Sequence, residues 1–383
     1  MQNLLSQPSL HFRHASNGVI YNTIWEELKN GQYKSIAPEH ILKNALIDGV
    51  DRTQNKPVLK DYFPIHKGML WNEEEKIPFD PIFIPNRMDV NMDCFLETSY
   101  CFFEQYKEKK IAVQLSGGLD SSIIIGLLKY FNIPFYLVGL TNQRFEFRTE
   151  KKIQNILAEW AQKTVLIDFE NCLPYSHIDK VPAHQYPEEY IRSFGPDYIM
   201  AQVSQEIGIE VLITGQGGDN LFGDAIYENP TELKWMPHTY YEGWSQDLIY
   251  APAKIELVPF YGYPKISELI YNLRFGHNED ITKIWARQFF KDFLPKELVT
   301  HCYRSDFWGL VISGVQQLIP HLPLMFEKTY ELTKNNYFHK DKVKEILKID
   351  FLDHTKENYM IIEPLIGISV WIDSLVRGGI IKN

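Results

Sequence analysis

Hydrophobic and polar positions alternate in a regular rhythm between residues 92 and 214. Short apolar runs, typical of buried strands, are separated by longer segments whose apolar residues recur at helical spacing. In the segment 149–162, for example, Ile153, Leu157 and Trp160 fall on one helical face. The pattern predicts helices over 92–106, 121–131, 149–162 and 198–207, and strands over 110–115, 134–140, 164–168 and 210–214. This alternation predicts an α/β fold in which a parallel sheet is sandwiched by helices.

The chain on either side of this stretch is patterned differently. Residues before about 87 mix short apolar patches with turn residues, and three prolines between 77 and 86 indicate an extended connector. After about residue 227, helical patterns and aromatic residues dominate, and no succession of strands is evident. We therefore expect a small N-terminal domain over 1–91 and a main domain over 92–383 that ends in a helical part.

Composition narrows the class of protein. The 383-residue chain is 45% hydrophobic and 23% charged, which is ordinary for a globular protein. A net charge of -10 argues against a broad basic surface for nucleic acid. No apolar run approaches the roughly 20 residues that cross a bilayer, and no secretory signal is recognisable. The four cysteines lack zinc-site spacing, so we expect reduced thiols in a cytoplasmic protein.

A glycine- and serine-rich loop separates the first predicted strand of the main domain from the next helix. It reads Ser116-Gly117-Gly118-Leu119-Asp120-Ser121-Ser122. The glycines let backbone amides approach an anion, the following helix directs its positive end there, and the serines add hydroxyl donors. Asp120 would repel a phosphate unless a cation such as Mg²⁺ lay between them. The alternative is a serine-capped turn, and the loop lacks the G-K-[ST] of a Walker motif.

A second loop follows the last predicted strand. It reads Thr214-Gly215-Gln216-Gly217-Gly218-Asp219-Asn220-Leu221-Phe222-Gly223. Its glycines again permit close approach of the backbone, and Asp219 supplies a second carboxylate. Together with Asp120 it could hold magnesium on a triphosphate, although a structural turn capped by aspartate has the same composition.

These motifs resemble known proteins. The first loop resembles the signature of the ATP-pyrophosphatase superfamily, a HUP-like α/β fold whose members cleave ATP between the α- and β-phosphates. Both loops, with the segment 192–223, resemble the synthetase domain of the class B asparagine synthetase family, over roughly residues 92–310. That family includes β-lactam synthetases and lasso-peptide macrolactam cyclases. The resemblance implies Mg²⁺ at Asp120 and Asp219, and ATP contacts at Gln114, Ser116, Gly117, Gly118, Ser121, Ser122, Val138 and Gly215.

The chain departs from true asparagine synthetases at two catalytic positions. Gln216 stands where they carry a glutamate, and an amide cannot act as a base, although it could orient a substrate. The segment 301–309 resembles the stretch that supplies a lysine, but its nearest cation is Arg304. Arg304 could stabilise developing negative charge, or merely pair with Asp306. The general base is left open among His184, Glu188, Glu189, Asp224 and Glu228.

The front of the chain departs as well. Glutamine-dependent relatives carry a cysteine after the initiator methionine, whereas this sequence has Gln2. Residues 53–71 faintly resemble the end of their amidotransferase domain. We therefore interpret 1–91 as a reduced, non-catalytic remnant, and expect the amine to come from a source other than glutamine.

The sequence thus predicts an ATP- and Mg²⁺-dependent ligase that adenylates a carboxylate and couples it to an amine. By resemblance it is closer to the lasso-cyclase and β-lactam synthetase branches than to asparagine production. The expected partners are small-molecule or peptide carboxylates and amines, with no nucleic acid and no membrane. A homo-oligomer and a biosynthetic partner protein both stay open. The alternatives are a lasso-type macrolactam cyclase, another pyrophosphatase-loop chemistry such as tRNA thiolation or NAD synthesis, and an inactive relative that acts as a binding partner.

Overall fold

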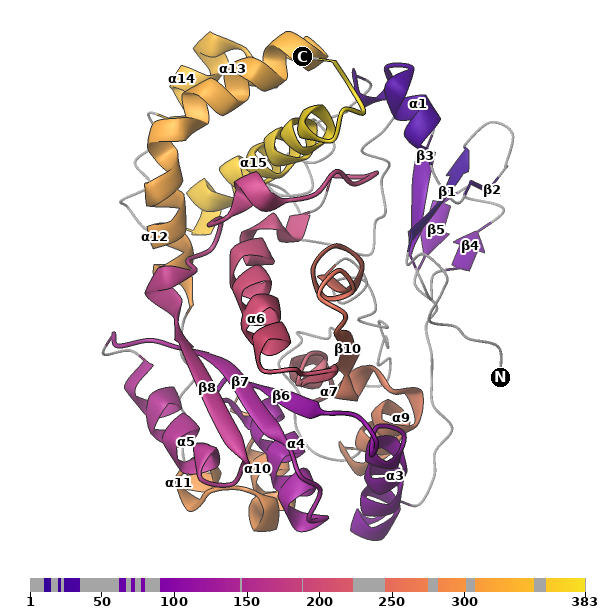
Figure 1. Ribbon diagram of the computed structural model, residues 1–383, viewed down its shortest axis with the longest axis vertical. Coiled ribbons are helices and arrows are strands. Elements are labelled where there is room, and N and C mark those ends of the chain that lie inside the picture. Colours follow the sequence, from indigo (N-terminus) through magenta and orange to yellow (C-terminus); the bar gives the residue numbers. More distant parts are fainter. Residues whose placement is uncertain are drawn as a thin grey trace.

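The computed structural model places the central and C-terminal parts of the chain and several short segments of its front (Figure 1). The residues it describes are 10–14, 20–21, 24–34, 62–66, 70–72, 77–79, 90–144, 147–187, 189–222, 245–274, 282–300, 307–347 and 356–382.

A five-stranded parallel sheet forms the centre of the protein, in the order β10-β9-β6-β7-β8. Its strands are β6 (Ile111–Leu115), β7 (Tyr136–Thr141), β8 (Lys163–Asp168), β9 (Val211–Thr214) and β10 (Glu256–Pro259). From β6 the chain first adds β7 and β8 on one side, then returns to add β9 and β10 on the other. The direction of winding therefore reverses between β6 and β9, where open parallel sheets bind their ligands beyond the carboxyl ends of the strands.

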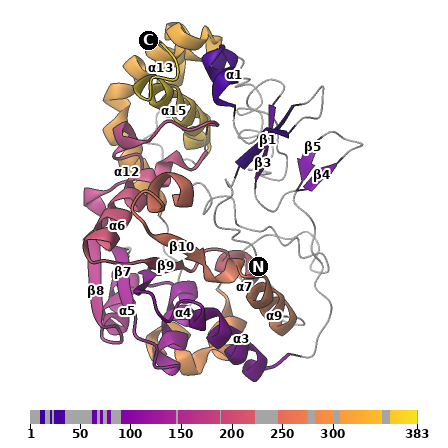
Figure 2. The same cartoon turned by 45° about the vertical axis from the view of Figure 1, so that its right-hand side comes forward.

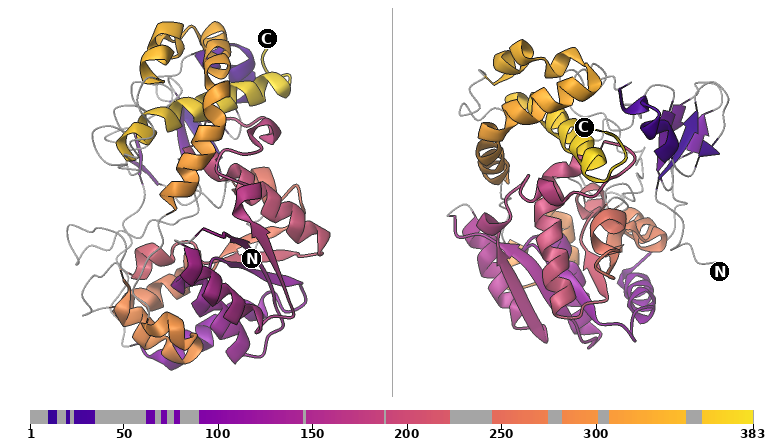
Figure 3. Two further views of the ribbon diagram at one scale, coloured as in Figure 1. Left: turned by 90° about the vertical axis from the view of Figure 1, so that its left-hand side faces the viewer. Right: turned by 45° about the horizontal axis from the view of Figure 1, so that its top comes forward.

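Helices cover both faces of this sheet, as its alternating side chains require. Val113 and Ile213 point into one core cluster, while Ala112 and Leu212 point into another. The first cluster is closed by α3 (Met92–Glu104), α4 (Leu119–Tyr130), α5 (Arg148–Ala158), α7 (Gly218–Phe222), α9 (Pro264–Arg274), α10 (Ile284–Phe289) and α11 (Lys296–Thr300). The second is closed by α6 (Phe194–Glu206), the short turn η7 (Gln246–Tyr250) and the C-terminal helices (Figure 3). The predicted α/β sandwich is confirmed.

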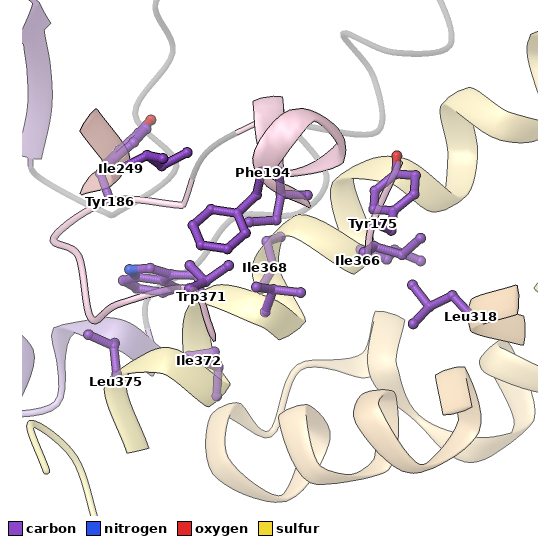
Figure 4. Packing of buried hydrophobic residues seen from close by; sticks show 14 of the residues in the cluster. Tyr175, Tyr186, Phe194, Ile249, Leu318, Ile366, Ile368, Trp371, Ile372 and Leu375 are labelled. Atoms are coloured by element: carbon purple, nitrogen blue, oxygen red, sulfur yellow. The ribbon is translucent and has the colours of Figure 1, made fainter. Parts of the chain in front are cut away.

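The C-terminal part is helical, as predicted. It comprises α12 (Trp308–Leu318), η10 (Ile319–His321), α13 (Leu322–Thr333), η11 (Asn336–Phe338), α14 (Lys340–Ile346) and α15 (Lys356–Arg377). Trp371 of α15 is fully buried and shares a cluster with Phe194 at the start of α6 (Figure 4). The indole N–H of Trp371 donates to the carbonyl of His184 at 2.8 Å, which fixes this helix to the loop before α6.

One stretch among the described residues, Trp308–Thr333, has the length and mean hydropathy of a membrane span, although the sequence pattern indicated none. It is divided by η10 into α12 and α13. Val315, Leu322 and Phe326 are buried in the cluster that also holds Trp371. One face of this helix pair therefore contributes to the core, although only 33% of the apolar window is buried and Leu324 of α13 is 73% exposed.

The described segments of the front form small antiparallel sheets. They are β1 (Leu10–His14), β2 (Ile20–Tyr21) and β3 (Tyr62–His66) in the order β2-β1-β3, and the pair β4 (Leu70–Asn72) and β5 (Ile77–Phe79). The short helix α1 (Trp25–Lys29) and turn η2 (Gln32–Lys34) bury Leu28 and Tyr33 in the cluster of the C-terminal helices (Figure 2). Residues 24–34 of the front are thus packed against the helical part, whereas most of the expected amidotransferase-like segment 53–71 lies outside the described residues.

The structure adds to the predicted elements in one place and shifts a boundary in another. The strand β10 lies in the region where the pattern indicated no strands, because four residues ending in a proline give little periodicity, and an edge strand tolerates proline. Helix α6 begins at Phe194 and not at Tyr198. Gly195 and Pro196 look like turn residues, but proline is compatible with the first turn of a helix. The remaining short turns are η4 (Phe169–Asn171), η5 (Ile178–Lys180), η6 (Glu189–Ser193), η8 (Phe260–Gly262) and η9 (Lys291–Phe293).

Candidate functional site

Both predicted loops lie side by side at the carboxyl edge of the sheet. The first leads from β6 into α4, and the second leads from β9 into α7 (Figure 1). β6 pairs directly with β9, with Val113 opposite Ile213. The two loops, far apart in the sequence, are therefore neighbours at the point where the winding of the sheet reverses.

Glycines allow the two loops to touch. A Cβ added to Gly218 would lie 2.6 Å from Cγ of Asp120, and one added to Gly215 would lie 3.0 Å from the amide nitrogen of Ser121. Gly117 adopts φ 84°, in the left-handed region that favours glycine. Larger residues at Gly218 would push the carboxylate of Asp120 away, so the loop sequence fixes where this group stands.

The serines of the first loop divide into exposed and buried groups. Ser116 is exposed, and its Oγ lies 2.9 Å from Oγ of Ser121 and accepts from the amide of Gly118 at 3.1 Å. The hydroxyl of Ser122 is buried and donates to the carbonyl of Gly118 at 2.6 Å. Ser116 is thus accessible to a ligand, whereas Ser122 stabilises the first turn of α4.

The carboxylates of Asp120 and Asp219 meet at a single cation, Lys283. Its Nζ lies 2.9 Å from each carboxylate oxygen of Asp120 and also bonds to Oδ1 of Asp219. The side chain of Lys283 is 9% exposed, that of Asp120 18% and that of Asp219 54%. The two predicted carboxylates are therefore brought together around one position that attracts positive charge.

Burial and neighbouring charges shift the pKa values of the side chains in and around this cluster. Burial raises the pKa of Asp120 to about 6; Lys283 opposes this shift, and the charge of Asp219 adds to it. Burial disfavours the charge of Lys283, but Asp120 and Asp219 more than offset this effect and raise its pKa. Burial also raises the pKa of Tyr261, whose hydroxyl donates to the backbone carbonyl of Asp120 at 2.9 Å. Perturbation of several groups at one sheet edge is typical of a functional site.

Lys283 was missed by sequence reasoning. It caps α10 on its N-terminal side with φ 54°, 163 residues from Asp120 along the chain. No motif surrounds it, and a lysine before an apolar helix normally reads as a solvated residue. The only unusual feature is its burial, which the fold alone reveals.

The donor set fits a divalent cation held partly by a ligand. Among the described residues, no group of three or more His, Cys, Asp or Glu side chains could hold a metal by itself. Two aspartates with oxygen donors are nevertheless what Mg²⁺ uses when substrate phosphates and water complete its shell. The arrangement thus suits a metal that arrives with a phosphate ligand.

The other residues predicted to contact ATP or substrate differ in how accessible their side chains are. Gln216 lies in the second loop and is partly exposed, between the glycines that approach Asp120. Gln114 is half-buried on β6 and lies opposite Val138 of β7. The side chain of Val138 is fully buried in a core cluster, so only its backbone is available to a ligand.

Arg304 lies outside the described residues, but the chain that follows it is well anchored. Phe307 packs against Phe147 with ring centroids 5.2 Å apart. Arg144 donates to Ser313 of α12 at 3.0 Å and pairs with Glu170 at 2.8 Å. These contacts place the start of α12 beside the carboxyl ends of β7 and β8, at the same edge of the sheet as the two loops.

Of the candidate bases, His184 has a structural environment. It is buried, its Nδ1 bonds to the carbonyl of Pro182 at 2.9 Å, and burial lowers its pKa to about 4. The side chains of Glu188, Glu189, Asp224 and Glu228 lie outside the described residues. The base therefore stays unassigned.

A parallel sheet with two glycine-rich loops and paired aspartates at its switch point defines an ATP-pyrophosphatase-like α/β domain. The sequence matches the family described as asparagine synthase over residues 106–255, which include both loops. Over this segment the chain is similar to the class B asparagine synthetase family, which supports an asparagine synthase-like domain.

Curated relatives agree with this assignment over part of their length. A probable glutamine-hydrolyzing asparagine synthetase of Acanthamoeba polyphaga mimivirus is 26% identical over 63% of this chain and 48% of its own. A putative one from Methanocaldococcus jannaschii is 30% identical over 30% of this chain and 21% of its own. The nodule asparagine synthetase of Pisum sativum is 25% identical over 39% and 26%. The matches thus span about half or less of each relative.

Proposed function

We propose that this protein is an ATP-dependent amide synthetase that forms AMP and pyrophosphate. It adenylates a substrate carboxylate and couples the acyl group to an amine, without glutaminase activity, in peptide or natural-product modification in the cytoplasm. The observation that carries the proposal is the meeting of Asp120 and Asp219 at one cation position, within the segment that matches asparagine synthase.

The site residues have distinct roles in this proposal. Ser116, the amides of the first loop and the N-terminus of α4 bind the phosphates, because exposed donors and the helix dipole point to one place. Asp120 and Asp219 hold Mg²⁺, which neutralises charge on the phosphates. Gln216 orients the substrate, and Arg304 stabilises negative charge during acyl transfer.

Atoms balance over two displacements. A carboxylate oxygen attacks the α-phosphorus, the bond to the β-phosphate breaks, and pyrophosphate leaves with that electron pair. The amine nitrogen then attacks the acyl carbon, AMP leaves, and the amine loses its proton to a base. Holding both reactants in one pocket supplies much of the rate increase, since effective molarities can reach about 10⁵ M or more.

The Lys283 contacts favour a second candidate, an inactive relative that serves as a binding partner. An ammonium that already bridges both carboxylates would make a metal unnecessary for folding. In that case Asp120 and Asp219 would be scaffold residues.

Pyrophosphate release separates the two candidates. Purified protein is mixed with ATP, Mg²⁺ and a panel of amino acids, peptides and other carboxylates, and pyrophosphate and AMP are measured together. An amide synthetase releases pyrophosphate in the presence of its acid and an equal amount of AMP when its amine is also present, and D120N abolishes both releases. Asp341→Asn is the matched control, because the side chain of Asp341 is 82% exposed on α14. No release with any acid, together with no ATP binding, would establish the inactive relative.

A further inference from the structure

We propose that Lys283 and a divalent cation compete for one position between Asp120 and Asp219, so that the metal binds tightly only together with the nucleotide. The inference rests on the proposed function, because it names what controls metal entry at the same site. It makes Lys283 a positioning residue that couples the two ligands.

The contacts of Lys283 use its full hydrogen-bonding capacity. An ammonium has three N–H donors and no acceptor. Two of the contacts go to the oxygens of Asp120, at 2.9 Å each, and the third goes to Oδ1 of Asp219. The ammonium therefore lies on the carboxylate oxygens that would ligate a metal, and no donor is left for a phosphate while it stays there.

Neighbouring groups prevent the carboxylate of Asp120 from moving aside in place of the Lys283 side chain. Gly218 lies so close that even an added Cβ would meet Cγ of Asp120 at 2.6 Å. The backbone of Lys283 is held as well, since its carbonyl accepts from the amide of Arg287 at 3.0 Å. The indole of Trp285, two residues on, donates to the carbonyl of Phe222 at 3.0 Å. The carboxylate of Asp120 and the backbone of Lys283 are thus held in place, so we expect the long side chain of Lys283 to move when a metal binds.

The formal charges of the site link displacement of the Lys283 ammonium to binding of the nucleotide. Two carboxylates and one ammonium carry a formal charge of −2 + 1 = −1. Adding a divalent cation without removing the ammonium gives −1 + 2 = +1, in a place where the lysine side chain is 9% exposed. A displaced, desolvated ammonium needs a new anionic partner. Phosphate oxygens supply one, so metal and nucleotide should each raise the affinity of the site for the other.

Binding of Mn²⁺ alone tests this coupling. The free Mn²⁺ signal in electron paramagnetic resonance is titrated with the wild-type protein, K283M and K283R, with and without α,β-methylene-ATP, whose α–β linkage cannot be cleaved. Wild type and K283R should bind Mn²⁺ weakly alone and about tenfold or more tightly with the nucleotide analogue. K283M should bind Mn²⁺ about tenfold more tightly than wild type in the absence of the analogue.

Lys291→Met is the matched control, because Lys291 is an exposed lysine close to Lys283 in the sequence. Thermal melting verifies that each variant is folded, and K283Q replaces K283M if the latter is not. Equal Mn²⁺ affinity of wild type and K283M without the analogue overturns the inference, as does an affinity of wild type that the analogue does not change. Absence of analogue binding in the wild type, whatever K283M does with Mn²⁺, instead overturns the proposed function.

Discussion

Two partly buried ionic clusters among the described residues of this protein differ in the charges of their members. Lys283 faces two carboxylates, Asp120 and Asp219, and the three side chains carry a formal charge of −1. Arg192 donates to one carboxylate, Glu363, at 2.9 and 3.3 Å, and this pair is neutral. Among these contacts one ammonium serves two carboxylates in the first group, whereas one guanidinium serves one carboxylate in the second, and we expect the first group to attract a further cation.

Their positions in the fold agree with this difference. The neutral pair joins η6 to α15, and the side chain of Glu363 is 15% exposed. The unbalanced group lies at the carboxyl edge of the sheet, where Asp219 is 54% exposed. Breaking a buried pair by removing one partner is destabilising, and the neutral pair therefore serves to hold layers together. We therefore expect the cluster around Lys283 to be a binding site and the Arg192–Glu363 pair to be a scaffold contact.

The largest effect is expected from D120N, which removes one carboxylate of the unbalanced group. Carboxylate-dependent pyrophosphate release should fall by about 100-fold or more, since the metal loses a ligand. Because the folded-state pKa of Asp120 is raised to about 6, its charged form is disfavoured in the folded protein above pH 6. Removing this unfavourable charge opposes the loss of a partner for the buried ammonium of Lys283, so the melting temperature at pH 7 should change little. A large loss of stability with normal turnover would assign Asp120 to the scaffold.

The opposite result is expected from Glu363→Gln, which removes the same charge from the neutral pair. Loss of the charge-assisted contacts between Arg192 and Glu363 should lower the free energy of unfolding by about 2 kcal/mol. Pyrophosphate release per folded molecule should not change. Chemical denaturation and turnover on the same preparation provide both values. Lost activity at unchanged stability would remove the distinction between the two pairs.

A smaller effect concerns His184, which belongs to the scaffold beside α15. Burial lowers its pKa from 6.5 to about 4, so the unfolded chain binds more protons than the folded protein between these values. Stability contributed by neutral His184 is complete above pH 6.5 and is lost as the pH falls towards 4, by about 3 kcal/mol. In His184→Gln this part of the pH dependence should disappear, whereas the exposed control His321→Gln should keep it. Urea denaturation at several pH values measures the slope, and an unchanged slope in His184→Gln would contradict the assignment.

The smallest effect is a difference in thiol reactivity. Cys172 is buried in the scaffold cluster, and burial followed by the charge of Asp168 raises its pKa to about 12. Cys101 is exposed on α3. Iodoacetamide at pH 8 should label Cys101 in the native protein and Cys172 only after unfolding, because the thiolate is the nucleophile. Peptide mapping measures the alkylation of both cysteines. Equal alkylation rates of Cys101 and Cys172 in the native protein would show that the scaffold cluster opens readily.

Sequence patterns predicted the sheet and its loops because both have local signals. Strands buried on both faces are continuous apolar runs, and the glycine-rich loop between β6 and α4 carries a specific sequence motif. β10 was missed because Glu256–Pro259 is a short edge strand that ends in proline. Lys283 was missed because its importance arises only when α10 brings it to two loops distant in the chain. Local patterns define elements, whereas a charge cluster assembled from three elements requires the fold.

The most direct test is the structure of the protein with α,β-methylene-ATP and Mn²⁺, located by its anomalous scattering. The predicted result is a manganese peak within bonding distance of carboxylate oxygens of both Asp120 and Asp219, with the ammonium of Lys283 moved onto phosphate oxygens. A manganese ion bound elsewhere, or an ammonium still lying between the two carboxylates with the nucleotide in place, would contradict the shared cation position.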